Sequence, residues 1–232
     1  MSLGGSTEII GIPGMSVIDV LPGTHEEALR ALQAVHLRHF EASYPWAVSD
    51  FERTWLHGAS QPNVIEHQWL LLVDGKPCGE CVFHVNLDRK VILRHYMAVD
   101  QDVRAGLPIE WLTDFNAFAE AWCDVDAQAK GIELQAMMSE IQSKHVAGWK
   151  RMGHVSPAIE YREPIHGKHW QKYGDVEFVS MSVNLKILPA GKQVPLREVT
   201  KAAVSAFLLD NYGLPESDPT VQSILFNCEQ LD

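Results

Sequence analysis

The sequence of 232 residues predicts an α/β (α+β) fold, a β-sheet flanked by helices, followed by a helical C-terminal extension. Three observations lead to this prediction. An apolar run at residues 91–99 is spaced like a buried strand and is followed by helical periodicity. Two β-rich runs flank Asp74 and Gly75, a strong tight-turn signal. Amphipathic helical stretches occur both before and after these strands.

The composition limits the classes of partner. With 46% hydrophobic residues the chain can bury one or two cores, and no stretch approaches the ~20 apolar residues of a membrane span. A formal charge of −11 argues against nucleic acid and anionic membranes, because both bind basic surfaces. No charged, apolar and cleavage-site pattern opens the chain, so we expect a cytoplasmic protein.

The four cysteines, Cys78, Cys81, Cys123 and Cys228, are few and unevenly spaced, which fits a reducing compartment better than a disulfide framework. Cys78 and Cys81 form a CxxC motif that invites a metal or redox interpretation. The motif lies inside an expected strand, where residues three apart point to opposite faces. We therefore predict ordinary buried cysteines and no metal site.

The N-terminal part predicts one strand and two helices. A strand is expected at residues 17–21, and a helix at residues 25–44, with Thr24 as a candidate cap. His36 and His39 lie one turn apart on that helix. Without a visible third ligand, we interpret them as exposed or capping histidines rather than a metal pair. A shorter helix and loop follow at residues 45–61, rich in aromatic residues.

The middle of the chain predicts a hairpin, a central strand and a long helix. The hairpin covers residues 67–86, and the chain turns at residues 87–90 into the strand 91–99. A polar turn at residues 100–106 precedes the helix, in which Pro108 suits the first position. Apolar residues then recur at helical spacing, namely Ile109, Leu112, Phe115, Ala119 and Trp122.

The C-terminal half predicts a strand at residues 131–138 and a helix at 139–152 that ends at Gly153. Further β-rich runs occur at residues 155–162 and 176–188, separated by a polar and aromatic loop at 163–175. A linker at residues 190–195 leads to amphipathic helices at 196–212 and 219–231. These apolar helices either cover the main domain or mediate formation of a homodimer.

A strand, a short loop with arginine and glycine, and a helix form the layout of an anion-binding turn. The free amides and the positive dipole end of a helix both point into such a loop. The alternative is a plain connection between a strand and a helix, which a lone Arg-x-Gly turn does not exclude.

The order of helix, helix, hairpin, strand, loop and helix resembles that of the GNAT acetyltransferase superfamily over about residues 15–188. In this family a loop of the form Arg/Gln-x-x-Gly-x-Gly/Ala follows the central strand, and Arg104 falls at its Arg/Gln position. The resemblance implies a mixed, largely antiparallel sheet of about six to seven strands. It also implies a flexible N-terminus at 1–14, an acyltransferase domain at 15–189 and a helical extension at 190–232.

The resemblance implies acetyl-CoA as acyl donor, with the diphosphate at the loop. Here Leu107 and Ile109 occupy the family's two small positions, and the small residues Ala105 and Gly106 come earlier. A later family helix, Asn-x-x-Ala-x-x-x-Tyr-x-x-x-Gly-Phe, aligns Gln142 with its Asn and Trp149 with its Tyr. The implied cofactor contacts are Met97, Val99, Arg104, Ala105, Gly106, Leu107, Gln142 and Trp149.

The implied reaction is direct acyl transfer to a primary amine of a small molecule or peptide. His95 is a candidate general base that we expect to share a strand face with Met97 and Val99, or else a buried structural histidine. Glu80 and Glu140 are weaker candidates. In the family the loop between the last two strands overhangs the acceptor, so the candidate substrate residues are His166, His169, Trp170 and Tyr173.

Two other functions remain open. The displaced glycines, Trp149 in the tyrosine position and the extra C-terminal helices are compatible with a catalytically silent GNAT scaffold that serves as an interaction or assembly module. A third hypothesis is an acyltransferase for longer acyl groups, which requires a wider exit for the pantetheine arm. Trp149 itself is either a wall of the pantetheine channel or simple packing, because an indole N–H donates a hydrogen bond but does not titrate usefully.

Overall fold

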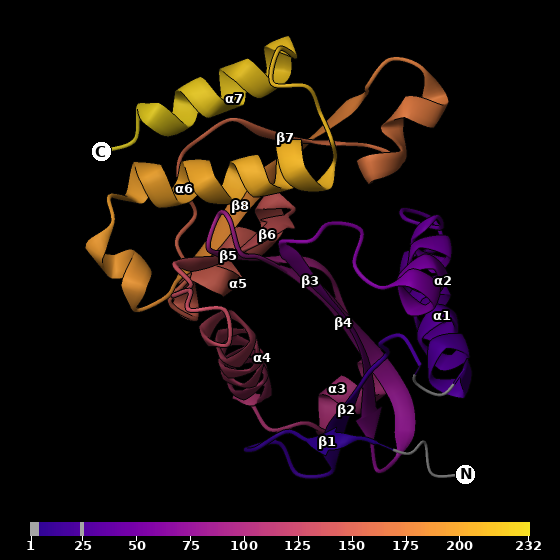
Figure 1. Cartoon of the computed structure of the whole chain (residues 1–232). Helices are drawn as coiled ribbons and strands as arrows, with labels where there is room; N and C mark the ends of the chain where they lie inside the picture. The colour runs from indigo at the N-terminus through magenta and orange to yellow at the C-terminus, as the bar shows by residue number, and fades with distance from the viewer. Residues whose placement is uncertain (1–4, 24–25) are drawn as a thin grey trace. The chain divides into compact units, whose positions relative to one another are not determined.

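The computed structural model describes residues 5–23 and 26–232 (Figure 1). Its eight strands follow the order β1-β2-β3-β4-β5-β6-β8-β7, so the mixed α/β architecture is confirmed, with a slightly higher strand count than predicted. The chain forms two compact units. Unit 1 comprises the chain up to His84 together with Arg94–Asp126, and unit 2 comprises Val85–Leu93 and Ala127–Asp232.

Unit 1 contains the N-terminal sheet and the helices that flank it. Its elements, some of which run a few residues into unit 2, are β1 (Thr7–Glu8), β2 (Met15–Asp19), α1 (Glu26–Phe40), α2 (Ala47–His57), β3 (Val64–Val73), β4 (Lys76–Asn86), β5 (Val91–Val99), α3 (Gln101–Gly106) and α4 (Trp111–Gln128).

The hairpin of β3 and β4 is confirmed around its predicted two-residue turn. Asp74 and Gly75 have φ angles of 50° and 74°. Positive φ at both central residues is the signature of a turn that matches the twist of the flanking strands, and Asp-Gly tolerates it well. The central strand also has its predicted limits, because β5 begins at Val91 and ends at Val99.

Helices cover the two faces of the unit 1 sheet through separate apolar clusters. On one side Leu29 and Leu32 of α1 and Phe51 of α2 pack with Leu70 of β3 and Val82 of β4. On the other side Trp69 of β3 packs against aromatic rings of β4 and α4, namely Phe83, Phe115, Phe118 and Trp122. The predicted amphipathic helices therefore bury their apolar residues as expected.

Unit 1 differs from the predictions near the N-terminus. The expected start of the first helix, with Thr24 and residue 25, lies outside the described residues. Within residues 5–14, expected to be flexible, β1 pairs with β2 and both Ile9 and Ile12 are buried. The first long strand is β2, two residues earlier than predicted.

The turn predicted at residues 100–106 is instead the short helix α3. Pro108 does not open the long helix, which begins at Trp111, and Ile109 is 95% exposed rather than part of its apolar stripe. The backbone is helical here, and the Arg104 amide donates to the Asp100 carbonyl, four residues earlier, at 2.9 Å. Phe115 and Ala119 do lie on the buried face of α4.

Unit 2 contains the C-terminal strands and helices. Its elements are β6 (Ala136–Ile141), η1 (Ser143–His145), α5 (Val146–Arg151), β7 (Tyr161–Pro164), η2 (Gly167–Tyr173), β8 (Phe178–Ile187), η3 (Ala190–Gln193), α6 (Leu196–Ser205), the π-helical η4 (Ala206–Asn211) and α7 (Pro219–Glu229). Antiparallel pairing joins β6 to β8 and β8 to β7.

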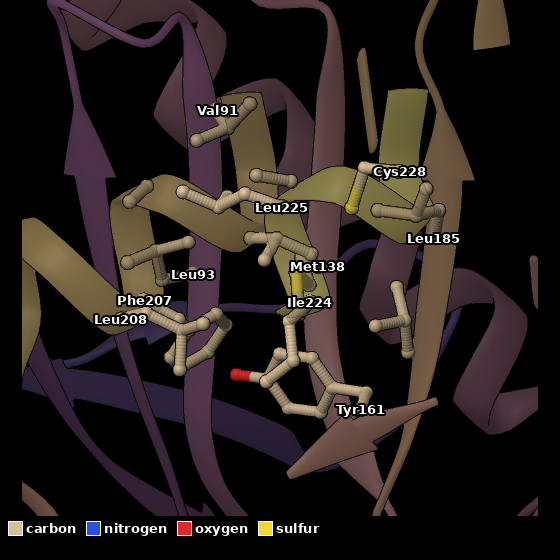
Figure 2. Packing of buried hydrophobic residues seen from close by; sticks show 14 of the residues in the cluster. Val91, Leu93, Met138, Tyr161, Leu185, Phe207, Leu208, Ile224, Leu225 and Cys228 are labelled. Atoms are coloured by element: carbon tan, nitrogen blue, oxygen red, sulfur yellow. The ribbon is translucent and has the colours of Figure 1, made fainter. Parts of the chain in front are cut away.

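The C-terminal helices are part of the core of unit 2 (Figure 2). Phe207 and Leu208 of η4 and Ile224 of α7 pack with Met138 of β6 and Leu185 of β8 in one buried cluster. Of the two alternatives for the apolar C-terminal segment, packing on the rest of the chain is therefore observed. The division into units also does not follow the predicted boundary between residues 189 and 190.

Several predicted elements of unit 2 have different limits. The strand predicted at residues 131–138 is β6, which continues to Ile141 because Ser139 and Glu140 still pair with Asn184 and Val183. The helix predicted at 139–152 is consequently reduced to η1 and α5. The run at 155–162 contributes only an isolated bridge at Val155 before β7. The single helix predicted at 196–212 changes from α to π geometry at Ala206.

Candidate functional site

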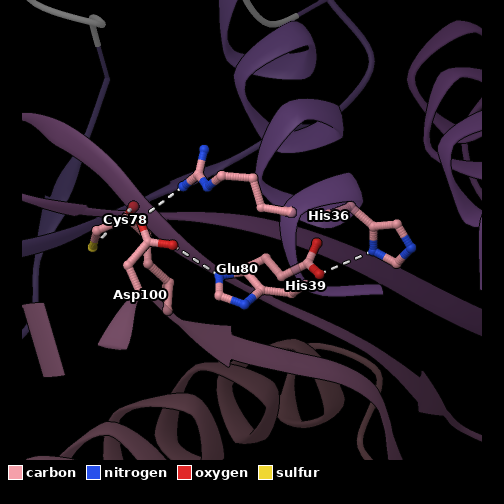
Figure 3. A network of polar contacts seen from close by, with 7 residues as sticks. His36, His39, Cys78, Glu80 and Asp100 are labelled. Atoms are coloured by element: carbon pink, nitrogen blue, oxygen red, sulfur yellow. Dashed lines mark hydrogen bonds and ion pairs between the residues drawn. The ribbon is translucent and has the colours of Figure 1, made fainter. Parts of the chain in front are cut away.

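The end of β5 leads into a polar network in unit 1 (Figure 3). The Asp100 amide donates to the Cys78 carbonyl of β4 at 2.7 Å. The Asp100 carboxylate accepts hydrogen bonds from Arg38 at 2.8 Å and from His39 at 2.9 Å, both on α1. Asp100 thus fixes the point at which the chain leaves the strand, and a carboxylate occupies the start of α3.

The predicted diphosphate loop has a helical backbone whose amides are partly used. The amide of Arg104 bonds to Asp100 within α3, and the amide of Leu107 donates to the Arg104 carbonyl at 3.3 Å. Arg104, Ala105 and Gly106 are exposed, and Leu107 is half-buried. The guanidinium of Arg104 is therefore the accessible cationic group of this segment.

The side chains of β5 do not alternate as predicted. Arg94 donates to Asn116 of α4 at 2.7 Å and contacts the Met97 sulfur at 3.8 Å. Tyr96 instead packs against His36 of α1, with ring centroids 4.9 Å apart. Residues 94 and 96 thus point to opposite faces of the sheet, which indicates a β-bulge between them.

The bulge separates His95 from Met97. His95 Nε2 lies 3.1 Å from Nδ1 of His84, and their ring centroids are 4.2 Å apart. Val82 and Glu80 of β4 face α1, so alternation along β4 places His84 on that face as well. The prediction that His95 shares a face with Met97 is therefore wrong. His95 belongs to the α1 side, half-buried and paired with a second histidine.

A buried ion pair joins His36 of α1 to Glu80 of β4 (Figure 3). His36 Nε2 donates to the Tyr44 carbonyl at 2.9 Å, and Nδ1 lies 2.9 Å from Glu80. A carbonyl only accepts, so Nε2 carries a proton, and a second proton lies between Nδ1 and the carboxyl. Burial raises the pKa of Glu80, and His36 acts against this rise. His36 is thus neither exposed nor a cap, contrary to the prediction.

Glu80 is a poor candidate for a base that meets a substrate from solvent. Its side chain is fully buried and engaged with His36. Its second oxygen has no hydrogen-bond partner among the described residues. An orphaned buried oxygen is costly, so the pair is a strained feature of the core rather than an open site.

In unit 2 the candidate cofactor residues lie on short helices. Gln142 precedes η1 and is exposed, and Trp149 of α5 is half-buried. The Trp149 ring lies 4.7 Å from that of His154, whose Nδ1 accepts from the Asn184 amide at 3.1 Å. Trp149 therefore packs on a buried, hydrogen-bonded histidine, which supports its interpretation as a packing residue.

The four candidate substrate residues of unit 2 behave differently from one another. The rings of His166 and Tyr173 are stacked, with centroids 3.6 Å apart, and Tyr173 is 58% exposed. His169 is half-buried and its amide donates to the His166 carbonyl at 3.0 Å. The Trp170 indole donates to the Tyr212 carbonyl at 3.0 Å and packs on the core. Only His166 and Tyr173 are brought together by their rings.

A cluster of carboxyl and phenol groups in unit 2 was missed by sequence reasoning. Glu140 of β6 accepts short hydrogen bonds from the hydroxyls of Tyr161 and Tyr212. Burial and the charge of the neighbouring Glu163 raise the pKa of Glu140 well above its ordinary value, against the effect of the two phenols. One signal was available, because Glu140 follows Ala136 and Met138 at alternate positions of an apolar strand face.

The described residues contain no group of three or more His, Cys, Asp or Glu side chains that could hold a metal ion. Within the same residues no helix is long and apolar enough to cross a membrane.

Comparison with known proteins connects this architecture to one family. No protein-family model and no curated protein matches the sequence. Among solved structures, a putative GNAT-family acetyltransferase from Bacteroides thetaiotaomicron is 12% identical, with a TM-score of 0.53 over 86% of this chain and 99% of its own. The chain has the GNAT acetyltransferase fold. The acetyl transferase of Salmonella typhimurium that modifies the N-terminal serine of ribosomal protein L7/L12 is 8% identical, with a TM-score of 0.50 over 79% of this chain and 99% of its own.

The predicted GNAT resemblance is thus confirmed for the fold. The structure also shows what occupies the two positions at which the sequence departs from the family pattern. At the place of the glycine-containing loop this GNAT fold has the helix α3, and at the place of the helix tyrosine it has the packed Trp149. The roles predicted for individual residues remain predictions at this point.

Proposed function

We propose that this chain is an N-acetyltransferase that uses acetyl-CoA to acylate a primary amine. The observation that supports the proposal most is the match of nearly the whole length of two acetyltransferase structures to 79–86% of this chain. The reaction joins the amine nitrogen to the acyl carbon and breaks the C–S bond of the thioester. The ammonium form of the acceptor must first lose a proton, and the departing thiolate must gain one.

His95 is the best candidate for the base. An imidazole titrates near neutral pH, and a base works best when its second nitrogen is held by a partner. His84 supplies that partner at 3.1 Å. In this scheme His95 Nε2–H donates to Nδ1 of His84, and Nδ1 of His95 takes the proton of the ammonium group. The β-bulge at residues 95–96 supports the assignment, because bulges often re-aim side chains beside active sites.

The donor contacts follow the family pattern, with one change. Backbone groups at Met97 and Val99 would contact the pantetheine arm, and Arg104 would contact the diphosphate through its side chain, with Ala105, Gly106 and Leu107 beside it. Gln142 and Trp149 complete the predicted set. Because the indole of Trp149 does not titrate, the thiolate would take its proton from water or from the acceptor ammonium by way of His95.

The acceptor contacts would come from His166, His169, Trp170 and Tyr173. The stacked rings of His166 and Tyr173 form a partly exposed, flat surface that fits an apolar or cationic group beside the amine. Candidate acceptors are small primary amines and peptides with a free N-terminus. We include peptides because one acetyltransferase structure with a similar fold belongs to an enzyme that modifies a protein N-terminal serine.

The first experiment is calorimetric titration with acetyl-CoA, followed by an acetylation assay over a panel of amines and peptides. We expect binding in wild type and weakening by about 10-fold to 100-fold in Arg104→Ala, the range for a lost hydrogen bond to a charged group. Arg30→Ala, which removes another exposed arginine of unit 1, is the matched control. Absence of heat and of any thermal shift at millimolar acetyl-CoA would exclude the proposal.

The base assignment has a separate test. His95→Ala should lower the rate by about 10²-fold to 10⁴-fold and remove the acidic limb of the pH–rate profile. The exposed His145 serves as control, because His145→Ala should leave both unchanged. A His95→Ala enzyme with the wild-type pH profile would mean that another group takes the proton.

A catalytically silent interaction module is the second candidate. It is favoured by α3, which consumes the Arg104 and Leu107 amides, and by Trp149 at the tyrosine position. The acetylation assay separates the two functions, because a silent module transfers no acetyl group to any amine whereas an enzyme must.

A further inference from the structure

Five half-buried rings of unit 1, which we name the ring row, follow one another from the turn after α1 to β4: Trp46, Tyr44, Tyr96, His95 and His84. The centroids of successive rings are 5.7, 5.4, 6.3 and 4.2 Å apart. The planes of successive rings are inclined by 84°, 56°, 48° and 56°, so the rings form an uneven wall rather than a closed stack. The row connects the candidate base, His95, to the turn between α1 and α2.

Beneath the ring row lies a second aromatic layer that is fully buried. Tyr96 contacts the ring of His36, with centroids 4.9 Å apart, and the ring of Phe51, at 6.3 Å. His36 and Phe51 are 0% and 3% exposed, whereas every ring of the row keeps part of its surface accessible. The buried layer belongs to the core of unit 1, and the ring row is its accessible aromatic surface.

The buried layer fixes the turn that carries Tyr44. His36 Nε2 donates to the Tyr44 carbonyl at 2.9 Å, and His36 Nδ1 lies 2.9 Å from the carboxylate of Glu80 on β4 (Figure 3). The Ala47 amide donates to the same carbonyl at 3.2 Å. A buried ion pair is costly and seldom adds stability, but this one ties the turn to the strand that carries His84. A ring surface held in this way loses little freedom when a ligand binds.

The chemistry of the row selects one class of acceptor. Aromatic side chains bind other rings through offset and edge contacts, and they attract ammonium groups through their faces. The overall charge of −11 also favours the approach of a cationic amine. An amine joined to an aromatic ring by a short spacer fits the row, because its ring can lie on Tyr44 or Tyr96 while its nitrogen reaches the neighbouring His95.

We propose that the acceptor is a primary amine that carries an aromatic ring, and that the ring row binds this ring. The inference rests on the proposed N-acetyltransferase function, with His95 as the base. It narrows the acceptors to arylalkylamines and to peptides whose first residue is aromatic, since both place an ammonium group close to a ring. Saturated amines of equal size lack the aromatic contact.

Paired acceptors test the preference. We compare kcat/KM for 2-phenylethylamine with 2-cyclohexylethylamine, and for the peptide Phe-Gly-Gly with Leu-Gly-Gly. The aromatic member should be favoured about threefold to tenfold, the range of a single aromatic contact beyond its apolar area. A preference in the amine pair identifies a small acceptor, and a preference in the peptide pair alone identifies a peptide N-terminus. Equal values within both pairs would overturn the inference.

Variants locate the contact. Tyr96→Leu and Tyr44→Leu should remove most of the aromatic preference, whereas Tyr96→Phe and Tyr44→Phe, which keep the ring, should retain it. Thermal unfolding confirms that each variant is folded. Phe226→Leu is the matched control, because it removes a 60% exposed ring from α7 in unit 2 and should leave the preference unchanged. An aromatic preference that survives in both leucine variants of the row would refute the assignment.

A binding measurement separates this inference from the function on which it rests. NMR titration of the protein with each member of the amine pair needs no acetyl transfer. If no amine is acetylated but 2-phenylethylamine binds more tightly than its saturated partner, and Tyr96→Leu abolishes the difference, the proposed function fails and the recognition of aromatic amines stands. If aromatic and saturated amines are acetylated equally well, the enzyme function stands and the role of the ring row is refuted.

Discussion

A buried histidine in unit 1 should make the free energy of unfolding of this protein fall as the pH becomes alkaline. His67 of β3 is 3% exposed and lies between two carboxylates, with Nδ1 2.5 Å from Asp19 and Nε2 3.1 Å from Asp126. Its ring stacks on Phe83 at 4.8 Å. Burial acts to lower the pKa of His67, but the contacts with Asp126 and Asp19 and their charges outweigh it and raise the pKa from 6.5 to about 9.

The magnitude follows from this rise. At roughly 1.4 kcal/mol per pH unit, the free energy of unfolding gains about 3 kcal/mol from His67. The contribution is complete below the unfolded pKa of 6.5 and is lost as pH rises to 9 and beyond. This contribution of His67 to the free energy of unfolding is an upper limit, because His67 Nε2 and the nearby Asp126 oxygen are close without forming an aligned hydrogen bond.

The assay is urea denaturation from pH 6 to pH 10 in wild type and His67→Gln, followed by tryptophan fluorescence. At pH 6 the variant should be less stable by up to about 3 kcal/mol, because it removes the cation that lies between the half-buried carboxylates of Asp19 and Asp126. The difference should shrink toward pH 10, where wild type has lost its own proton. His39→Gln, at a more exposed Asp100 pair, is the control. A difference that stays constant or grows with pH would refute the reasoning.

Three further predictions concern packing and thiols. Phe207→Ala, in the core of unit 2, should cost about 3 to 5 kcal/mol in urea denaturation, and the 60% exposed Phe226→Ala less than about 0.5. Gly79→Ala should cost about 1 to 3 kcal/mol, because the new methyl carbon would lie 3.1 Å from the Val99 Cα and closer to the Ala98 carbonyl, whereas Gly148→Ala in α5 should not destabilise. Burial raises the pKa of the Cys81 thiol to about 12, so a thiol reagent at pH 8 should label it only after unfolding.

Elements defined by local patterns were predicted well. The limits of β5 and the Asp74-Gly75 turn follow from apolar spacing and from backbone preferences that act within a few residues. The apolar stripe of α4 was largely found for the same reason. The family fold was predicted from the order of these elements, because the order is more specific than any single motif in it.

Elements controlled by distant pairing were predicted less well. β6 continues through Ser139 and Glu140 because β8 offers hydrogen bonds there, although the local sequence favours a helix. Pro108 was assigned to the start of a helix by local preference, but the chain first forms α3, tied to Asp100, which Arg38 and His39 of α1 hold in place. Neither partner is visible from the neighbouring sequence.

The candidate site shows the same division. His95 was chosen from its strand, but its partner His84 and the bulge that separates it from Met97 depend on contacts with β4 and α4. The hydrogen bonds that Glu140 accepts from Tyr161 and Tyr212 join three segments separated by up to 72 residues. A strand face that reads Ala136, Met138, Glu140 was the one local sign, since an acidic residue on an apolar face requires partners.

The helix α3 decides how a diphosphate could be bound. In a glycine-containing loop several backbone amides share the negative charge, and removal of one side chain only weakens binding. Here the amides of Arg104 and Leu107 donate within the protein, and the Asp100 carboxylate stands at the start of the helix. Attraction must then come mainly from the Arg104 guanidinium, which is exposed and screened by salt. If the chain binds acetyl-CoA at this segment, its affinity should fall with ionic strength in wild type and lose most of that dependence in Arg104→Ala.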